Sequence, residues 1–256
     1  MALIEYRVES GVGIVELNNP PANAYTLESL KQLDETIVKA RFDTGVHVLV
    51  VRGAGEKFFS AGADINMLSR ESNEFRNHFA LFGHETLARL ENTPKLVIAA
   101  INGHCVGGGL EIAMACDIRI AADDAKLSTA FTRIGMHPGM AATYLLTRLV
   151  GTARAAELFF TAKAIDAAEA ARIGLVNRTV PGDRLLAEAQ ALASEIAANA
   201  PIAIGMVKRA IYLAERADLD TMLEYEGLAQ PITMGTRDLL EGLQAAKDKR
   251  DPSFSG

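Results

Sequence analysis

The 256-residue sequence predicts an α/β core followed by a helical C-terminal part. Continuous apolar runs at 46–51 and 96–101 indicate strands that are buried on both faces of a sheet. Helical patterns alternate with these runs up to about residue 140, which is typical of a sheet with parallel strands. Beyond that point Ala-rich segments with helix start and stop residues predominate, and only residues 174–180 still indicate a strand.

The N-terminal part begins with two short expected strands. Apolar residues alternate along 4–8, and a second strand is expected over 11–18, after a Ser-Gly pair. Thr26 is a preferred N-cap residue for the helix that follows. The apolar side of that helix is Leu27, Leu30, Leu33 and Ile37. Residues 57–65 come after the strand at 46–51 and are expected to form a loop.

The rest of the chain continues this alternation and then becomes helical. The expected elements are a helix at 75–90, strands at 95–103 and 117–122 with a helix opening at 107–109 between them, and helices at 154–162 and 166–174. The last of these helices starts with an Asp-x-x-Glu pattern and stops at Gly174. Helical segments are expected from there to about residue 250, with no repeat of fixed period.

The composition excludes several classes of protein. Hydrophobic residues make up 49% and charged residues 23%, which allows a sizeable core and argues against disorder. The net charge is −6 without clustered basic residues, so no nucleic-acid partner is expected. Cys105 and Cys116 lie in or beside apolar runs without ligand spacing, which indicates buried reduced thiols and no metal. Without a secretory signal or a membrane-length apolar run, a cytoplasmic protein with no membrane partner is expected.

A run of glycines, Gly107–Gly109, leads into an apolar helix with Glu111 in its first turn. The spacing matches neither a phosphate-binding P-loop nor a dinucleotide-binding turn. Close packing at a tight turn is one explanation of the glycines. The other is an oxyanion hole, since a helix start presents unpaired N–H groups to a developing negative charge. A second glycine loop, at 59–64, can supply another donor.

Two glycine-containing stretches, 57–65 and 94–122, together with 137–151, resemble the enoyl-CoA hydratase/isomerase family of the crotonase superfamily. The resemblance continues through 151–181 and 235–250. It implies a crotonase-like spiral of ββα units with the CoA site over residues 1–195. It also implies a helical region at 196–256 that mediates trimers, two of which often stack as a hexamer. The substrate implied is an acyl-CoA thioester of fatty acid metabolism, and no cofactor is needed because CoA is part of the substrate.

The same resemblance implies roles for particular residues. The backbone N–H groups of Ala63 and Gly108 match the oxyanion hole, and Glu111 matches the first catalytic glutamate. Residues that match the substrate-binding groove are Ala24, Ser60, Ala61, Asp64, Ile65, Gly107, Phe131 and Lys249. Three of the charged residues also have plain explanations: Asp64 can cap the next helix, Glu111 can complement a helix dipole, and Lys249 can be solvated. The family's basic residue before Asn23 is missing, which leaves the CoA phosphate contacts open.

The sequence departs from the family at the second catalytic glutamate, where Phe131 stands four residues before Gly135. The acid that some isomerases and dehalogenases carry further along falls on Gly139. A single carboxylate is better suited to a 1,3-proton shift than to hydration. In hydration one group takes a proton from water while another supplies the proton at C2. We therefore expect 3,2-enoyl-CoA isomerisation or an atypical 2-enoyl-CoA hydration. Phe131 should also make the pocket drier and raise the pKa of a nearby carboxyl.

His137 is a further candidate for proton transfer, with packing of its loop as the alternative explanation. Tyr144 and Tyr25 are weaker candidates of the same kind. Two other functions remain open on this scaffold. The chain can be an acyl-CoA hydrolase or decarboxylase that keeps the oxyanion hole, or an acyl-CoA-binding protein with little catalysis.

Overall fold

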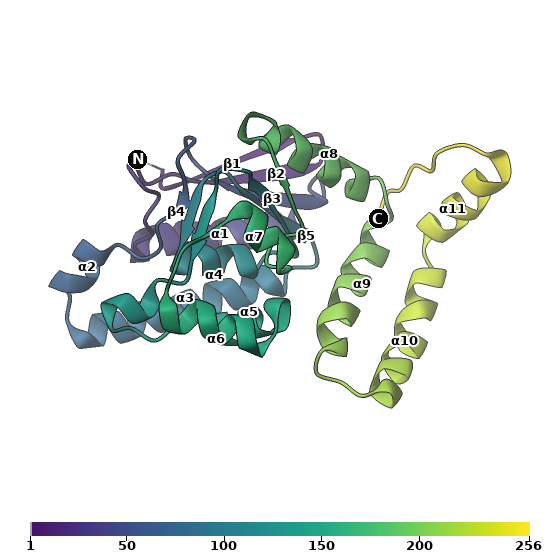
Figure 1. Cartoon of the computed structure of the whole chain (residues 1–256). Coiled ribbons are helices and arrows are strands. Elements are labelled where there is room, and N and C mark those ends of the chain that lie inside the picture. The colour runs from purple at the N-terminus through teal and green to yellow at the C-terminus, as the bar shows by residue number, and fades with distance from the viewer. Residues whose placement is uncertain (1) are drawn as a thin grey trace.

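The structure, a computed structural model, describes residues 2–256 and contains two sheets covered by helices (Figure 1). The larger sheet has the order β1-β2-β3-β5-β7-β10, and the smaller sheet has the order β4-β6-β8-β9. The strands of the larger sheet are β1 (Ile4–Glu9), β2 (Val12–Leu17), β3 (Val48–Gly53), β5 (Leu96–Ile101), β7 (Ile118–Ala122) and β10 (Arg178–Val180). Those of the smaller sheet are β4 (Phe58–Ser60), β6 (His104–Val106), β8 (Lys126–Ser128) and β9 (Ile165–Asp166).

Successive strands wind between the two sheets. Each of β3, β5 and β7 lies in the larger sheet and is followed by β4, β6 or β8 in the smaller one, with parallel pairing in both. The prediction of a loop at 57–65 is therefore partly wrong, because Phe58–Ser60 forms β4. Gly53 and Gly103 permit this close crossing: an added Cβ would lie 2.1 Å from the Phe58 carbonyl oxygen and 2.3 Å from that of Lys57.

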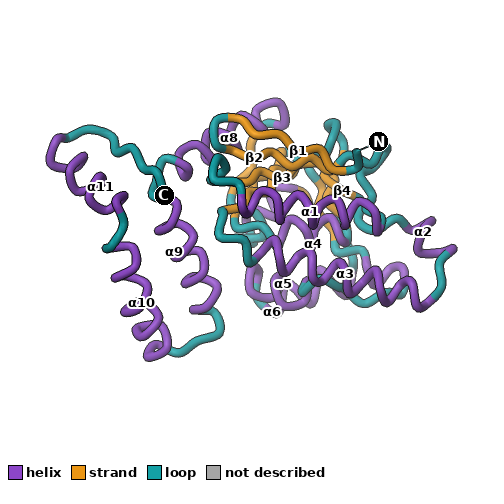
Figure 2. Tube along the Cα trace, turned by 180° about the vertical axis from the view of Figure 1, so that it is seen from behind, coloured by secondary structure: helices purple, strands orange, loops and turns teal. Residues whose placement is uncertain are grey.

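The core helices expected from the sequence are present, and a helix at 142–150 adds to them. Thr26 caps α1 (Leu27–Phe42), whose Leu30, Leu33 and Ile37 are buried. Helix α3 (Asn73–Glu91) packs against α1, and Figure 2 shows both on the same side of the strands. The remaining core helices are α2 (Ile65–Arg70), α4 (Gly108–Met114), α5 (Ala142–Val150), α6 (Thr152–Thr161) and α7 (Ala167–Arg172), with 3₁₀ turns at Phe131–Ile134 and Gly182–Arg184. The α/β prediction and its long elements are confirmed.

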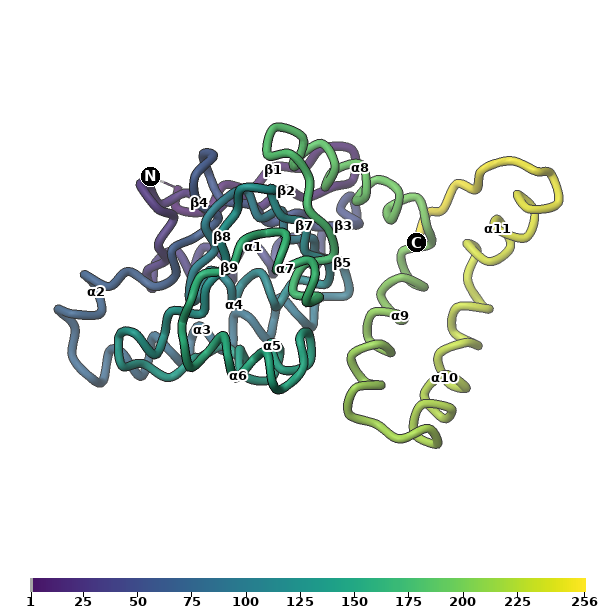
Figure 3. Tube along the Cα trace, viewed as in Figure 1, coloured from purple at the N-terminus to yellow at the C-terminus, as the bar shows by residue number. Residues whose placement is uncertain are grey.

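The C-terminal helices separate from this core after α8 (Leu185–Ala197), which packs on the larger sheet. Helices α9 (Pro201–Ala214), α10 (Leu219–Met234) and α11 (Arg237–Asp248) stand beside the core in Figures 1 and 3. Within residues 2–256 no single helix has the length and apolar composition to span a membrane; the pair 182–197 and 201–214 meets that test only together, with a 106° bend.

Helix α9 is fastened to the core by a buried polar cluster around Asp117. The Lys208 ammonium donates to Asp117 Oδ2 at 2.8 Å, and the Tyr212 hydroxyl donates to Oδ1 at 2.7 Å. The backbone N–H of Val97, in β5, also donates to Oδ2 at 2.7 Å. Lys208 is only 6% exposed, so the pair joins the C-terminal helices to the large sheet away from water.

Candidate active site

The turn from β6 into α4 requires glycine at three successive positions. Gly107 has a φ of 54°, in the left-handed region, and its N–H donates to the Ser128 carbonyl at 2.8 Å. A Cβ on Gly108 would lie 2.0 Å from the Tyr25 hydroxyl oxygen, and one on Gly109 would lie 2.4 Å from the Ser60 carbonyl oxygen. Close packing therefore explains the glycines, and it also brings the start of α4 against the loop after β4.

Two backbone N–H groups are left without partners where these segments meet. In the parallel bridge between Tyr25 and Ala63, the bonds run from Tyr25 N–H to the Gly62 carbonyl (2.8 Å) and from Asp64 N–H to the Tyr25 carbonyl (2.9 Å). The N–H of Ala63 faces the other side, as alternate residues of an extended segment do. Neither this N–H nor that of Gly108 donates a hydrogen bond within residues 2–256.

The two free donors are held near each other. An added Cβ on Gly62, next to Ala63, would lie 2.9 Å from the backbone nitrogen of Gly108. Preorganised N–H donors of this kind stabilise an oxygen that becomes negative during a reaction. The arrangement is the one expected for an oxyanion hole.

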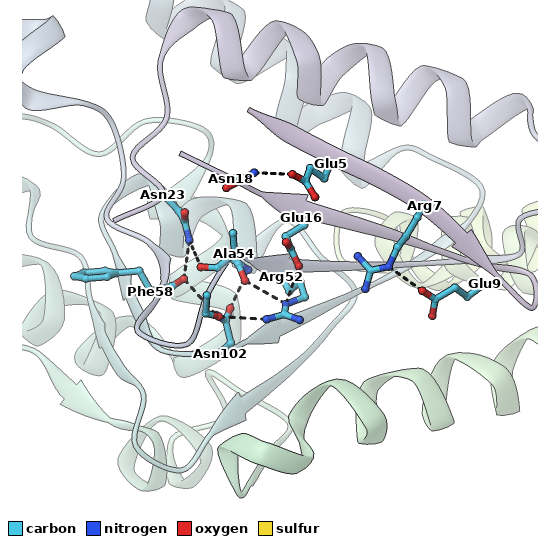
Figure 4. A network of polar contacts seen from close by, with 12 residues as sticks. Glu5, Arg7, Glu9, Glu16, Asn18, Asn23, Arg52, Ala54, Phe58 and Asn102 are labelled. Atoms are coloured by element: carbon cyan, nitrogen blue, oxygen red, sulfur yellow. Dashed lines mark hydrogen bonds and ion pairs between the residues drawn. The ribbon is translucent and has the colours of Figure 1, made fainter. Parts of the chain in front are cut away.

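The loop that carries Ala63 is fixed by hydrogen bonds from the segment before α1. The Ser60 hydroxyl donates to the Asn23 carbonyl at 2.7 Å and accepts from the Gly62 N–H at 3.1 Å. The Asn23 amide donates to the carbonyls of Ala54 and Phe58, both at 2.9 Å, as Figure 4 shows. Ser60 is fully buried, so its hydroxyl supports the loop.

A second asparagine fixes the chain that precedes β4. Oδ1 of Asn102 accepts from the Gly53 N–H at 2.8 Å, and its amide donates to the Gly55 carbonyl at 2.9 Å. Nearby, Arg52 pairs with Glu16 at 3.4 Å, which ties β3 to β2 (Figure 4). The chain that leads into residues 61–64, which we call the oxyanion loop, is thus held by both asparagines, as preorganisation requires.

Glu111 lies in the first turn of α4 and is 2% exposed. Its Oε1 accepts a hydrogen bond from the Gly139 N–H at 2.8 Å. Burial raises the pKa of this carboxyl from the ordinary 4.5 to about 7, and the bond from Gly139 opposes that rise. A carboxyl that titrates near neutral pH can both accept and donate a proton during turnover.

Phe131 is buried, 5% exposed, at the start of the 3₁₀ turn. Its ring is the neighbour of Gly107, where an added Cβ would lie 3.8 Å from Cε1. The structure thus puts an apolar ring, which cannot transfer protons, next to the glycine turn.

The three weaker candidates differ in position. His137 is exposed, and its Nδ1 lies 2.6 Å from the carbonyl oxygen of Pro138. The Tyr144 hydroxyl is buried without a partner within residues 2–256, and Arg148 covers its ring. Tyr25 is closest to the glycine turn: its hydroxyl adjoins Gly108 and contacts only the Met140 sulfur, at 3.9 Å. Burial, followed by the Glu111 charge, raises the pKa of Tyr25 well above its ordinary value.

His84, on α3, is a neighbour of Glu111 that the sequence did not single out. An added Cβ on Gly139 would lie 3.2 Å from Nε2 of His84 and 3.8 Å from Oε1 of Glu111. The residue before it, Gly83, could have indicated this contact, because a glycine inside a helix often marks a close approach of another segment. An added Cβ on Gly83 would indeed lie 2.3 Å from Cε of Met140.

The residues matched to the substrate groove fall into two groups. Ala24 and Ala61 are half-buried beside the oxyanion loop, and Ile65 is 64% exposed at the start of α2. The Asp64 carboxylate caps α2, since it accepts from the N–H groups two and three residues further on, at 2.8 and 3.1 Å. Lys249 is set apart: it ends α11, which lies at the opposite end of the molecule from α2 in Figures 1 and 3.

Residues 2–256 contain no group of three or more His, Cys, Asp or Glu side chains that can hold a metal ion. Cys105 and Cys116 are both free and buried, as the sequence indicated. The groups that the structure brings together at the site are the two N–H donors, the Glu111 carboxyl and the nearby side chains.

The chain is similar to known proteins along nearly its whole length. The family model of enoyl-CoA hydratase/isomerase matches residues 7–256. The chain is 40% identical over 243 residues to the short-chain-enoyl-CoA hydratase of Clostridium acetobutylicum, covering 94% of this chain and 93% of that one. It is 36% identical over 247 residues to the crotonyl-CoA hydratase of Syntrophomonas wolfei, covering 96% and 95%.

Solved structures share the whole fold. The crystal structure of an enoyl-CoA hydratase from Bacillus anthracis matches with a TM-score of 0.97 and 38% identity, over 99% of each chain. An enoyl-CoA hydratase structure from Geobacillus kaustophilus matches with a TM-score of 0.95 and 35% identity, over 99% of this chain and 97% of that one. The crotonase-like α/β fold expected from the sequence is confirmed. The chain belongs to the enoyl-CoA hydratase/isomerase family of enzymes, which act on CoA thioesters.

Proposed function

We propose that this enzyme moves a proton between C2 and C4 of an enoyl-CoA thioester and so converts a 3-enoyl-CoA into the 2-enoyl isomer. The observation that carries the proposal is Glu111: a single buried carboxyl, with a pKa raised to about 7, at the helix start that presents the Gly108 N–H. By its resemblance to the family, the chain has Phe131 at the position that matches a second carboxylate. The reaction therefore has to run with one acid and base group, and a 1,3-proton shift needs only one.

The proposed steps use two parts of the site. The N–H groups of Ala63 and Gly108 bind the thioester oxygen and stabilise the negative charge that grows on it when C2 loses its proton. Each such donor typically contributes about 3–4 kcal/mol to transition-state stabilisation. Glu111 takes the proton from C2, the dienolate is held by the two donors, and the same carboxyl returns the proton at C4. No cofactor takes part, since CoA belongs to the substrate.

Hydration of a 2-enoyl-CoA is the second candidate. The names of the relatives support it, because the proteins from C. acetobutylicum and S. wolfei are called hydratases of short-chain enoyl-CoA and crotonyl-CoA. It uses the same oxyanion hole and the same protonation of C2. It also requires a group that accepts a proton from water, and Phe131 cannot provide it.

The placement of CoA follows from the half-buried residues beside the oxyanion loop. Ala24, Ala61 and the exposed Ile65 would line the path of the pantetheine and the nucleotide, and Gly107 and Phe131 would adjoin the acyl group. Lys249 lies too far along the molecule to reach the site of its own chain, so its contact with the nucleotide would be made in the site of another copy. We divide the chain at residues 195 and 196, close to the end of α8.

The C-terminal helices support assembly into trimers or stacked trimers. Large apolar side chains are exposed along them: Ile202, Val207, Ile211, Leu219, Leu223, Leu228, Ile232, Met234, Leu239, Leu240 and Leu243. A patch of this kind is typical of a subunit interface. We also propose a cytoplasmic location, which is supported by the two free cysteines, because thiols stay reduced there.

Turnover of 2-enoyl- and 3-enoyl-CoA esters in deuterated buffer tests the proposal. The wild-type enzyme should isomerise 3-enoyl-CoA and introduce deuterium into the acyl chain faster than it hydrates crotonyl-CoA. Glu111→Gln should lose this turnover and still bind the CoA ester. Unchanged turnover in Glu111→Gln would remove Glu111 from the mechanism. Release of free CoA or of CO₂ would instead indicate a hydrolase or decarboxylase, and binding without any turnover would indicate an acyl-CoA-binding protein.

A further inference from the structure

Helix α3 brings an imidazole to the mouth of the site. The bare backbone of Gly83 allows the segment around Met140 to approach α3 closely, since an added Cβ there would lie 2.3 Å from the Met140 methyl carbon. His84, the next residue, thereby lies beside Gly139. The contact joins two segments that are far apart in the sequence, and it depends on a small residue on each side.

His84 and Glu111 both approach Gly139. The three nearest atoms to an added Cβ on Gly139 are Nε2 and Cδ2 of His84, at 3.2 and 3.9 Å, and Oε1 of Glu111, at 3.8 Å. The distance between Nε2 and Oε1 is at most the sum of their two distances to that point. Two groups at so short a separation can act on neighbouring atoms of one substrate.

The imidazole is available for a ligand. His84 is exposed, unlike Glu111, and neither ring nitrogen makes a hydrogen bond within residues 2–256. His137, by contrast, has Nδ1 close to the carbonyl of Pro138, in its own loop. Imidazole is the side chain best suited to exchange protons near neutral pH.

We propose that His84 is the second proton-transfer group of this site and gives the enzyme a hydratase activity in the absence of a second carboxylate. The inference rests on the oxyanion hole and on Glu111, which are parts of the proposed function. It assigns to α3 a role that hydration requires and that isomerisation does not.

In the hydration step Nε2 of His84 accepts a proton from water while the water oxygen bonds to C3 of the 2-enoyl-CoA. The C2–C3 π electrons move toward the thioester, whose oxygen is stabilised by the N–H groups of Ala63 and Gly108. Protonated Glu111 then donates its proton to C2, and the 3-hydroxyacyl-CoA is complete. The imidazolium releases its proton to solvent and the carboxylate takes one up, so one water molecule is added and the enzyme is restored.

Two rates measured on the same variants test this role. His84→Gln should lower kcat for crotonyl-CoA hydration by about 10²–10⁴-fold, the usual contribution of a positioned acid or base, with little change in KM. Its isomerisation of 3-enoyl-CoA, and the deuterium uptake that goes with it, should stay within a few-fold of wild type. The matched control is His78→Gln: His78 is also exposed on α3, and both rates should be unchanged.

Gly139→Ala provides an independent variant, which keeps the His84 side chain but shifts the position of its ring. Its methyl group would come within 3.2 Å of Nε2, so the ring has to move, while the contact with Glu111 at 3.8 Å is an ordinary one. Hydration should therefore fall by a larger factor than isomerisation, because only hydration needs the imidazole in its present position. In the double variant with His84→Gln, hydration should fall little further than in His84→Gln alone.

Each outcome decides between the two proposals. Unchanged hydration in His84→Gln would overturn the role of His84, and so would an equal fall of both reactions, which indicates a structural effect. A wild-type enzyme that isomerises but does not hydrate would overturn it too, while the proposed function would stand. A wild-type enzyme that only hydrates, and loses this activity in His84→Gln, would support His84 and contradict the proposed isomerisation.

Discussion

The backbone N–H of Gly139 donates a hydrogen bond to Oε1 of Glu111 at 2.8 Å, and Glu111 is buried, at 2% exposure. Two opposing effects act on the same group. Burial disfavours the carboxylate, whereas the hydrogen bond favours it, and burial prevails, so that the pKa rises to about 7. The bond also fixes the orientation of the carboxyl beside Gly139, the residue that His84 adjoins as well. Position and proton affinity of Glu111 thus both depend on the loop before α5.

The pH dependence of isomerisation should report this pKa. Glu111 has to be ionised in the free enzyme in order to take the proton from C2. We therefore expect kcat/KM for 3-enoyl-CoA to rise with pH to a plateau, with a midpoint near 7. Steady-state rates from pH 5 to 9 measure the midpoint, and the residual rate of Glu111→Gln should lack it. A midpoint close to 4.5, the ordinary pKa of glutamate, would show that burial does not raise the pKa of Glu111.

Stability should change in the opposite sense with pH. The folded-state pKa of Glu111 lies above its unfolded value, so the folded state keeps the proton longer and the free energy of unfolding falls as pH rises between about 4.5 and 7. The total effect is about 3 kcal/mol. Glu111→Gln should remove this part of the slope and be more stable than wild type at pH 8. Denaturant unfolding at one protein concentration measures it, and parallel pH profiles of the two proteins would contradict the assignment.

Gly108→Ala should disable the oxyanion hole. The new Cβ would meet the Tyr25 hydroxyl oxygen at 2.0 Å and Cε1 at 2.5 Å, so either the ring or the start of α4 has to move. Displacing the Gly108 N–H should lower kcat by about 10²–10³-fold. Gly227→Ala is the matched control, since an added Cβ there has open space around it. Wild-type kinetics in a folded Gly108→Ala enzyme would exclude this N–H as a donor.

The sequence was sufficient for the parts of this site that depend on local signals. The long strands and α1 carry apolar patterns over several residues, and the Gly107–Gly109 turn with Glu111 has a recognisable spacing. Strands of two or three residues, such as β4 and β9, are too short for a periodic pattern, and the position of β4 depends on the crossing at Gly53 and Gly103.

His84 was missed for a related reason. Nothing in its own helix points to proton transfer, because the relevant contact is made by a different segment. The imidazole lies beside Glu111 only because the segment with Gly139 and Met140 packs against α3. Proximity of this kind is a property of the tertiary structure, and a single sequence carries only an indirect sign of it in Gly83.

Phe131→Glu should raise the rate of hydration, because it adds a carboxyl beside the glycine turn that can take a proton from water. The variant should be less stable than wild type, since a buried ring is replaced by a polar group in an apolar environment. The gain should be largest in the His84→Gln background, where the imidazole no longer contributes. Crotonyl-CoA hydration in the single and double variants measures it. A folded enzyme without any gain would mean that position 131 does not face the reacting carbons.

Lys208→Met should loosen the C-terminal helices from the core. The substitution keeps an unbranched side chain of similar length but leaves the Asp117 carboxylate buried with one partner fewer, and removing one member of a buried pair typically costs about 3–5 kcal/mol. Proteolysis under native conditions should then cut first between α8 and α9, and the midpoint of denaturant unfolding should fall. Lys247→Met, on the exposed surface of α11, is the control and should change neither. Equal stability of Lys208→Met and wild type would show that the Lys208 ammonium is not needed to hold α9 in place.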